Sequence, residues 1–330
     1  MNEPILEIKD LRVYYYIPEG VVKAVDRVNL KIGKEEALGL VGESGCGKST
    51  VALSIPRLIR KPGKIVGGQI LFEGEDLLTK SEGEMRKIRG KKISMVFQHP
   101  GASMNPVYTV GSQIAEAIKL HQKVEKHEVK KKVEEILYKV GIPSPAQRME
   151  DYPHEYSGGM LQRAMIAMAL SCNPQLLIAD EPTTSLDVTI QAQILELMKT
   201  LRKDFGTSIL LIGHDLGVIS ELCDRVTVMY AGKVAESADI ETIFKNPEHP
   251  YTQALLESIP RLDMDRERLR IIRGSVPRLI NPPSGCRFHP RCDYAMEICS
   301  KQEPMIVEVG QGHEVACFLH ASEGKPNKPS

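Results

Sequence analysis

Nine residues at positions 42–50, GESGCGKST, combine glycines, a lysine and hydroxyl side chains in a pattern suited to phosphate. They match G-x-x-x-x-G-K-[ST], in which glycines let backbone N–H groups turn inward around phosphate oxygens. Lys48 would reach the β- and γ-phosphates of a nucleotide, and the Ser49 hydroxyl would bind Mg²⁺. A glycine-rich turn without a ligand is the alternative. Because an apolar strand pattern precedes the motif and a helical pattern follows it, we expect a nucleoside triphosphate to bind.

An apolar run that ends in two carboxylates lies at 176–181, with the sequence LLIADE. The run predicts a buried strand, at whose end Asp180 can hold Mg²⁺, while Glu181 points the other way and can orient or deprotonate water. Such carboxylates are costly to bury without a cation. A strand that runs into an exposed acidic turn would have the same sequence pattern and is the alternative. With Lys48 upstream, the pattern favours hydrolysis of the bound nucleotide.

A second set of small residues precedes a helical pattern in YSGGMLQR at 156–163. Ser157, Gly158 and Gly159 would lie at the amino end of a helix, where N–H groups and the helix dipole favour an anion. An ordinary helix cap has the same composition. The chain has two phosphate-binding patterns but one metal-binding pattern. We therefore expect the two phosphate-binding patterns to bind the same nucleotide, each contributed by a different subunit.

The scaffold that positions these residues is predicted to be an α/β fold. Residues 5–40 alternate apolar and polar side chains in the manner of antiparallel strands. A strand is expected at 91–98, and buried strands at LLIADE and at 208–212. Apolar residues at helical spacing predict a helical block at about 100–165. Strands that alternate with helices predict a mostly parallel core sheet, into which the helical block is inserted.

Composition excludes several classes of protein. The 330 residues contain 43 Lys and Arg and 43 Asp and Glu, so no overall field favours nucleic acid or anionic lipid. The longest apolar runs are too short to span a bilayer, and the amino terminus lacks the apolar core of a signal peptide. We therefore expect a soluble, cytoplasmic protein whose membrane role, if it has one, comes through a partner.

The motifs and their order resemble the nucleotide-binding subunits of ATP-binding cassette (ABC) transporters over about residues 5–245. GESGCGKST resembles the Walker A loop, Gln98 the Q-loop glutamine, YSGGMLQR the signature, LLIADE Walker B, TSLD at 184–187 the D-loop, and His214 the switch histidine. The resemblance implies a P-loop NTPase (RecA-like) core, an antiparallel β subdomain, the helical subdomain insertion at about 100–165 and an irregular, Cys-rich C-terminal extension.

The resemblance also implies a role for each motif residue. Glu181 would be the general base for attack of water on the γ-phosphate of ATP, and His214 would hydrogen-bond that phosphate. Mg²⁺ would be held by Ser49, Gln98 and Asp180. The adenine would stack on Tyr15, with Tyr14 and Tyr16 as alternatives because neighbouring strand residues face opposite ways. Within the same subunit, further ATP contacts would come from the phosphate-binding loop: Gly42, Glu43, Ser44, Gly45, Cys46, Gly47, Lys48 and Thr50. Across a dimer interface, they would come from the signature: Ser157, Gly158, Gly159 and Gln162. The D-loop residues would be Ser185 and Asp187.

About residues 245–320 resemble the C-terminal region of oligopeptide and dipeptide importers, in NPEHPYTQALLESIPRLD, RGSVPRLINPPSGCRFHPRC and HEVACFLH, so 246–330 is the expected C-terminal extension. This implies that residues 1–245 form the nucleotide-binding domain of an ATPase that powers peptide import at the cytoplasmic face of a bacterial or archaeal membrane. The implied partners are two membrane permease subunits, a second ATPase subunit (homologous or identical) and an extracellular peptide-binding protein reached through the permease. The alternatives are transport of nickel or another small solute, and a soluble ABC ATPase acting on nucleic acid, which the balanced charge disfavours.

Four of the seven cysteines lie in this proline-rich extension at the spacing C-x5-C-x6-C-x17-C: Cys286, Cys292, Cys299 and Cys317. A metal centre would stabilise a segment with few large apolar residues. The alternatives are disulfides, disfavoured in a reducing cytoplasm, and unliganded thiols. Zinc sites usually show C-x2-C pairs, whereas wider spacing suits a [4Fe–4S] cluster, which resemblance to peptide-importer ATPases also favours. Three histidines lie nearby as further candidate ligands: His289, His313 and His320.

Overall fold

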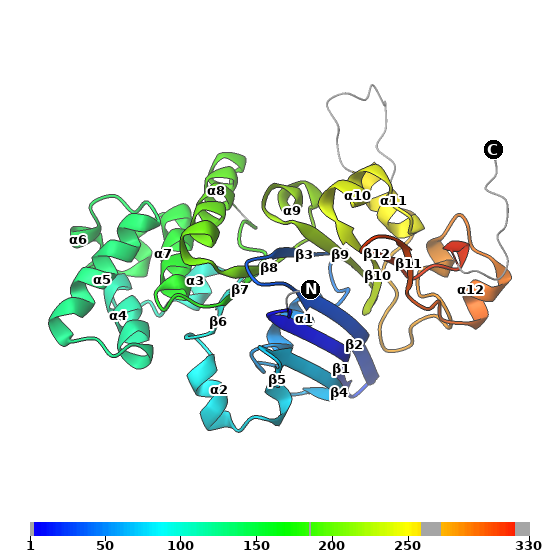
Figure 1. Ribbon diagram of the computed structural model, residues 1–330, viewed down its shortest axis with the longest axis horizontal. Coiled ribbons are helices and arrows are strands. Elements are labelled where there is room, and N and C mark those ends of the chain that lie inside the picture. Colours follow the sequence, from blue (N-terminus) through cyan, green and yellow to red (C-terminus); the bar gives the residue numbers. More distant parts are fainter. Residues whose placement is uncertain (1–2, 185, 259–271, 321–330) are drawn as a thin grey trace. The chain divides into compact units, whose positions relative to one another are not determined.

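A computed structural model of the chain describes residues 3–184, 186–258 and 272–320 (Figure 1). The chain forms two compact units, each built from segments far apart in the sequence. The first unit contains Met1–Leu6, Ile32–Ala37 and Phe72–Ile212, and the second contains Glu7–Lys31, Leu38–Leu71 and Gly213–Ser330. Among the described residues, no helix combines the length and the apolar character needed to cross a membrane.

The first unit contains the parallel strands β6 (Ile93–Val96), β7 (Leu176–Asp180) and β8 (Ser208–Gly213), with β7 in the middle. All five residues of β7 are buried, and the first four are apolar, as a strand within a parallel sheet requires. Because the strands are parallel, their carboxyl ends share one edge, which is where α/β proteins bind ligands. Asp180 therefore ends its strand at the functional edge of this sheet.

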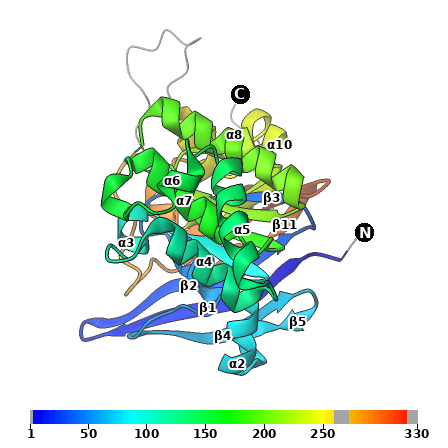
Figure 2. The ribbon, with the colours of Figure 1, turned by 90° about the vertical axis from the view of Figure 1, so that its left-hand side faces the viewer.

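Helices between β6 and β7 form the expected helical block (Figure 2). They are α3 (Pro100–Ser103), α4 (Val110–His121), α5 (Lys126–Lys139), α6 (Pro145–Arg148), the 3₁₀ turn η2 (Pro153–Glu155) and α7 (Gly158–Leu170). Helix α7 packs against α3, α4, α5 and β6, and eight of its residues are buried, as expected for a helix that is apolar on most of its circumference. The signature motif thus begins the central helix of this block.

Shorter elements and one long helix complete the first unit. Strand β5 (Glu75–Asp76), the 3₁₀ turn η1 (Leu77–Thr79) and α2 (Glu82–Ile88) precede β6, and α8 (Val188–Phe205) connects β7 to β8. Asp187 caps α8 by accepting a hydrogen bond from the Ile190 N–H at 2.9 Å. Asp187 therefore fixes the start of the long helix that follows β7.

The second unit contains a sheet with the order β2-β1-β4, formed by β1 (Leu6–Ile17), β2 (Gly20–Ile32) and β4 (Gly63–Phe72). Two residues connect β1 to β2, so these strands pair antiparallel as expected from their alternating sequence. The positive φ of Asp10, 48°, shifts the alternation along β1, because Ile8 and then Leu11 are buried. This shift decides which way the tyrosines at the end of β1 face.

A further sheet in the second unit has the order β11-β12-β10-β9-β3. Its strands are β3 (Ala37–Val41), β9 (Arg225–Tyr230), β10 (Lys233–Asp239), β11 (Val307–Gly310) and β12 (His313–Val315). Strand β3 is parallel to β9, whereas β10 is antiparallel to both β9 and β12. The last strands of the C-terminal extension therefore extend the sheet that carries the phosphate loop.

The remaining elements of the second unit are helices and turns: α1 (Lys48–Ser54), α9 (Leu216–Leu222), α10 (Ile240–Lys245), α11 (Pro250–Glu257), η3 (His289–Arg291), α12 (Glu297–Lys301) and η4 (Phe318–His320). Most of the described extension before β11 is irregular apart from α11, η3 and α12, in keeping with its many prolines.

Candidate functional site

The phosphate loop joins the buried strand β3 to α1, and its glycines occupy positions that other residues could not. Gly42 has φ 151°, and a Cβ there would lie 2.1 Å from the Met229 carbonyl oxygen. Gly47 has φ 107° and would place a Cβ 2.2 Å from the Ala24 carbonyl oxygen. Both contacts are to backbone, which cannot move aside, so the loop requires glycine at these places.

Lys48 is folded over the loop that it follows. Its side chain is almost fully buried, and its Nζ donates to the carbonyl oxygens of Gly42 at 2.7 Å and Glu43 at 3.1 Å. These bonds hold the ammonium group inside the loop, where phosphate oxygens would be attracted to it. Cys46 is also buried, and burial raises the pKa of its thiol, so we expect a neutral packing group there and no nucleophile.

The three consecutive tyrosines of β1 have different surroundings. The Tyr15 hydroxyl lies 3.5 Å from Thr50 Oγ1 on α1, the helix that follows the phosphate loop. The Tyr14 hydroxyl donates to the Asp26 carboxylate at 3.2 Å, and Tyr16 is 47% exposed. Of the three, Tyr15 is therefore the one whose hydroxyl contacts α1.

Two other predicted residues of the second unit are exposed near the starts of helices. Ser49 is exposed in the first turn of α1, and His214 is exposed immediately after β8. Asp215, the next residue, caps α9 by accepting a hydrogen bond from the Gly217 N–H at 2.7 Å. His214 is thus fixed between the end of a buried strand and the start of a helix.

In the first unit, Gln98 and Glu181 are brought together. Gln98 Nε2 donates to Glu181 Oε2 at 2.9 Å, and the Thr184 hydroxyl donates to the same oxygen at 2.9 Å. Glu181 has a positive φ, 46°, and its N–H donates to the Ile212 carbonyl at 3.0 Å, while Asp180 is buried. Donors of this kind orient an ionised carboxylate, which can then accept a proton from water.

The signature residues differ in exposure. Ser157 caps α7, where its Oγ accepts from the Met160 N–H at 3.3 Å, and both Ser157 and Gly158 are exposed. Gln162 is 1% exposed, and its Nε2 has no hydrogen-bond partner among the described residues. The amino end of α7 is therefore accessible to an anion, whereas the Gln162 side chain faces the interior. Ser185 of the D-loop lies outside the described residues.

The predicted site residues thus fall into two groups. The phosphate loop, Tyr15 and His214 belong to the second unit, and the carboxylates, Gln98 and the signature belong to the first. Within the phosphate loop, the Glu43 side chain does not face the loop interior, because its carboxylate pairs with Arg291 Nη1 at 2.7 Å.

All four cysteines of the extension line one cavity, together with aromatic side chains such as Phe288. Burial raises the pKa values of Cys286, of Cys292 to about 11 and of Cys317 to about 12, and the neighbouring thiols raise them further. The cavity therefore favours neutral thiols, and a bound cation would reverse that preference. Convergence of four thiols is what a cysteine-ligated centre needs.

The described side chains nevertheless do not form a ready ligand set for the predicted iron–sulfur or zinc centre. Among the described residues there is no group of three or more His, Cys, Asp or Glu side chains that could hold a metal ion. The nearby histidines bind elsewhere: His289 Nδ1 lies 2.8 Å from the Cys286 carbonyl oxygen, His313 Nε2 lies 2.7 Å from Glu236, and His320 Nε2 lies 3.1 Å from the Glu248 carbonyl oxygen. Any centre here would have to rely on the cysteines.

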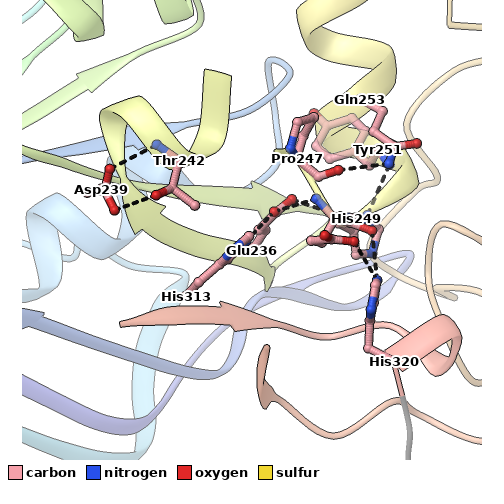
Figure 3. A network of polar contacts seen from close by, with 10 residues as sticks. Glu236, Asp239, Thr242, Pro247, His249, Tyr251, Gln253, His313 and His320 are labelled. Carbon is pink, nitrogen blue, oxygen red and sulfur yellow. Dashed lines mark hydrogen bonds and ion pairs between the residues drawn. The ribbon is translucent and has the colours of Figure 1, made fainter. Parts of the chain in front are cut away.

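A buried polar network attaches the extension, including the start of α11, to Glu236 of β10 (Figure 3). Glu236, with no exposed surface, accepts from the backbone N–H groups of Glu248 at 2.7 Å and His249 at 2.9 Å, and its carboxylate also contacts His313. His249 Nδ1 accepts the N–H of Tyr251 at 3.0 Å. Burial lowers the pKa of His249 to about 3, which keeps this ring neutral and able to accept.

Sequence patterns missed Tyr251, which, like Arg291, contacts the phosphate loop. The hydroxyl of Tyr251, a fully buried residue of α11, accepts a hydrogen bond from the Glu43 N–H at 2.9 Å. These residues are 208 positions apart, so no local motif could have connected them. In the sequence, the run HPYTQALLE contributes only to the resemblance to the C-terminal extension of peptide importers, and no helix was predicted there.

Two protein families match parts of the chain. Residues 25–184 match the family described as ABC transporter, and residues 235–299 match the family described as oligopeptide/dipeptide transporter, C-terminal region. The first match therefore includes the phosphate loop, Gln98, the signature and Glu181, and the second includes the first three cysteines of the extension.

Curated relatives match nearly the whole chain. The oligopeptide transport ATP-binding protein AppD of Bacillus subtilis (strain 168) is 51% identical over 321 residues, which cover 97% of this chain and 98% of the relative. The probable peptide ABC transporter ATP-binding protein y4tR of Sinorhizobium fredii is 50% identical over 316 residues, which cover 95% of this chain and 94% of the relative.

Solved structures show the same fold. A dimeric ATP-binding cassette in a post-hydrolysis state, bound to ADP and Pi, is 27% identical and covers 71% of this chain and 98% of its own, with a TM-score of 0.65. The cbiO1 protein of Clostridium perfringens, part of the ABC transporter complex cbiONQ, is 27% identical, with a TM-score of 0.64 and coverage of 74% of this chain and 92% of its own. These similarities confirm the predicted α/β fold.

Proposed function

Because the chain belongs to the ABC transporter family, in the group that carries the oligopeptide/dipeptide transporter C-terminal region, we propose that it powers import of di- or oligopeptides by hydrolysing ATP. One observation carries the peptide assignment: relatives named for peptide transport are about half identical along both the cassette and the extension. Import of nickel or another small solute by the same machinery is the alternative. The protein would then work at the cytoplasmic face of a bacterial or archaeal membrane.

The geometry supports a division of labour in hydrolysis. ATP would lie on the phosphate loop, with Lys48 at its phosphates and Tyr15 at its adenine. Ser49, Gln98 and Asp180 would hold Mg²⁺, which neutralises phosphate charge when bound. Glu181, already oriented by two hydrogen-bond donors, would take the proton of the attacking water.

His214 and the signature would complete the reaction site. His214, exposed after β8, would donate to the γ-phosphate as negative charge develops there. Ser157, Gly158 and Gly159, at the accessible end of α7, would contact ATP bound to a second ATPase subunit, homologous or identical, with Asp187 and Ser185 nearby in the D-loop. The buried Gln162 would support α7 from inside the helical block, and its predicted contact with ATP would require its side chain to turn outward.

Two domains follow from this assignment. Residues 1–245 would form the nucleotide-binding domain and 246–330 its extension, with the helical block at about 100–165 docking onto two permease subunits. The block starts directly after Gln98, so a residue that contacts Glu181 is joined to the element that would move the permease. An extracellular peptide-binding protein would deliver the solute to the other side of the permease.

The cysteine cavity would hold a [4Fe–4S] cluster through Cys286, Cys292, Cys299 and Cys317, with zinc as the alternative. The support is the convergence of all four thiols on one cavity. The role would be structural, because the residues proposed for hydrolysis lie elsewhere in the sequence. Anaerobic purification followed by iron, sulfide and zinc analysis tests the assignment: about four irons per chain support the cluster, one zinc supports the alternative, and neither metal removes both.

Transport by the assembled complex tests the function. The chain would be reconstituted in liposomes with its permease and binding protein, and uptake of a labelled dipeptide, a labelled pentapeptide and ⁶³Ni²⁺ would be compared with and without ATP. We expect ATP-dependent uptake of peptide only. Uptake of nickel alone would support the alternative, and ATP hydrolysis without uptake of any of the three would contradict the peptide assignment.

A further inference from the structure

The phosphate loop is held by an ion pair that comes from the C-terminal extension. Arg291, at the end of η3, points both arms of its guanidinium at the Glu43 carboxylate, with Nη1–Oε2 at 2.7 Å and Nη2–Oε1 at 3.1 Å. The two residues are 248 positions apart, and the Arg291 side chain is 6% exposed. A two-pronged pair of this kind fixes direction as well as distance.

Arg291 is itself fixed by other partners. Its Nε donates to the Arg273 carbonyl oxygen at 2.8 Å, and its Nη1 also donates to the Tyr230 hydroxyl at 3.2 Å. The guanidinium carbon lies 5.7 Å from the centre of the Tyr230 ring, within range of a cation–π interaction. With these donors engaged, the guanidinium cannot turn away from Glu43 without losing several bonds at once.

Glu43 is held at its backbone as well. The Tyr251 hydroxyl accepts the Glu43 N–H, and the Glu43 carbonyl oxygen accepts from Lys48 Nζ at 3.1 Å. Tyr251 packs edge-on against Tyr230 with ring centres 4.6 Å apart, and the network of Figure 3 fixes the start of its helix. Glu43 is therefore bound both by Arg291 of the extension and by Lys48, the lysine proposed to contact phosphate.

We propose that Arg291 is a positioning residue for nucleotide binding, acting through Glu43 on the phosphate loop. This inference rests on the proposed ATPase function. A loop that is already in its binding conformation does not have to be ordered when ATP binds. The Arg291–Glu43 ion pair, here called the clamp, therefore strengthens nucleotide binding without contacting ATP. Glu181 and the residues around it are not altered, so loss of the clamp would raise the KM for ATP and leave kcat nearly unchanged.

The experiment uses the purified full chain and four variants: Arg291→Ala, Glu43→Ala, the double variant, and Arg278→Ala as a matched control. Arg278, like Arg291, belongs to the C-terminal extension, but its side chain is exposed. The measurements are the Kd of a fluorescent ATP analogue and the kcat and KM for MgATP. We expect Arg291→Ala to raise Kd and KM about tenfold, which corresponds to about 1.4 kcal/mol, with kcat within about twofold and the control unchanged.

The double variant separates positioning from general stability. If Arg291 acts through Glu43, Arg291→Ala adds nothing to the Kd of Glu43→Ala. Additive effects of the two substitutions, or equal effects of Arg291→Ala and Arg278→Ala, would overturn the inference while leaving the ATPase assignment intact. A wild-type chain that neither binds nor hydrolyses ATP would overturn that assignment itself.

A second variant covers the case in which Arg291→Ala does not fold. Glu43→Gln keeps the size of the side chain and one acceptor oxygen but removes its charge. We then expect a Kd raised about threefold with an unchanged kcat, and a Kd equal to that of the wild type would reject the clamp.

Discussion

Replacing Glu236 by glutamine should destabilise the fold although it changes one oxygen atom to an NH₂ group. In the buried carboxylate, Oε1 accepts from the Glu248 N–H and contacts His313, while Oε2 accepts from the His249 N–H. Glutamine has one acceptor oxygen, so in either orientation one buried backbone N–H faces an NH₂ group. An unsatisfied buried donor costs about 1–3 kcal/mol, and we expect Glu236→Gln to lower the free energy of unfolding by that amount.

Urea unfolding of the full chain measures this loss as a shift of the midpoint at unchanged slope. Glu241→Gln is the matched control, because Glu241 is 74% exposed on α10 and pairs only with Lys245 among the described residues. An exposed pair contributes little, so the control should stay within about 0.5 kcal/mol of the wild type. If the free energy of unfolding of Glu236→Gln also stayed within that range, the view that the network attaches the extension to the core would be refuted.

Three further outcomes are expected. Gly42→Ala should cost about 1–3 kcal/mol of stability because its Cβ would meet the Met229 carbonyl oxygen, and a thermal midpoint within 1 °C of the wild type would contradict this. Lys48→Ala should raise the Kd for ATP at least about tenfold with the fold intact by circular dichroism, and an unchanged Kd would reject its phosphate contact. Because the pKa of His249 is lowered to about 3 in the fold, the unfolded chain binds the extra proton below pH 6.5, so this residue should cost about 1.4 kcal/mol of stability at pH 5.5 relative to pH 7.5. His249→Asn should remove that part of the pH dependence, and an equal loss in both proteins would show that His249 does not cause it.

The patterns that could be predicted from the sequence are those whose residues are consecutive. The phosphate loop follows from glycines and a lysine within nine residues, and the buried strand β7 follows from four apolar residues before Asp180. Periodicity likewise placed the helical block between two strands. In these cases the chemistry of neighbouring residues determines the local structure.

The contacts that hold the loop could not be predicted in this way. Arg291 and Tyr251 reach Glu43 from positions far along the chain, and nothing in HPRC or HPYT signals a partner in the phosphate loop. The burial of Gln162 was also missed, because a signature motif does not reveal which face of α7 packs inward. Such contacts depend on tertiary packing, which a single sequence encodes only indirectly.

The proposed hydrolysis of ATP with Glu181 as general base is tested most directly by two measurements on Glu181→Gln: its rate of ATP hydrolysis and its affinity for ATP. The glutamine keeps the shape of the side chain but cannot accept a proton, and loss of a general base costs about 10²–10⁴ in rate. Glu196→Gln, at an exposed position on α8, is the control. We expect at least a hundredfold loss of kcat for Glu181→Gln with ATP still bound, and wild-type turnover by this variant would contradict the general-base role of Glu181.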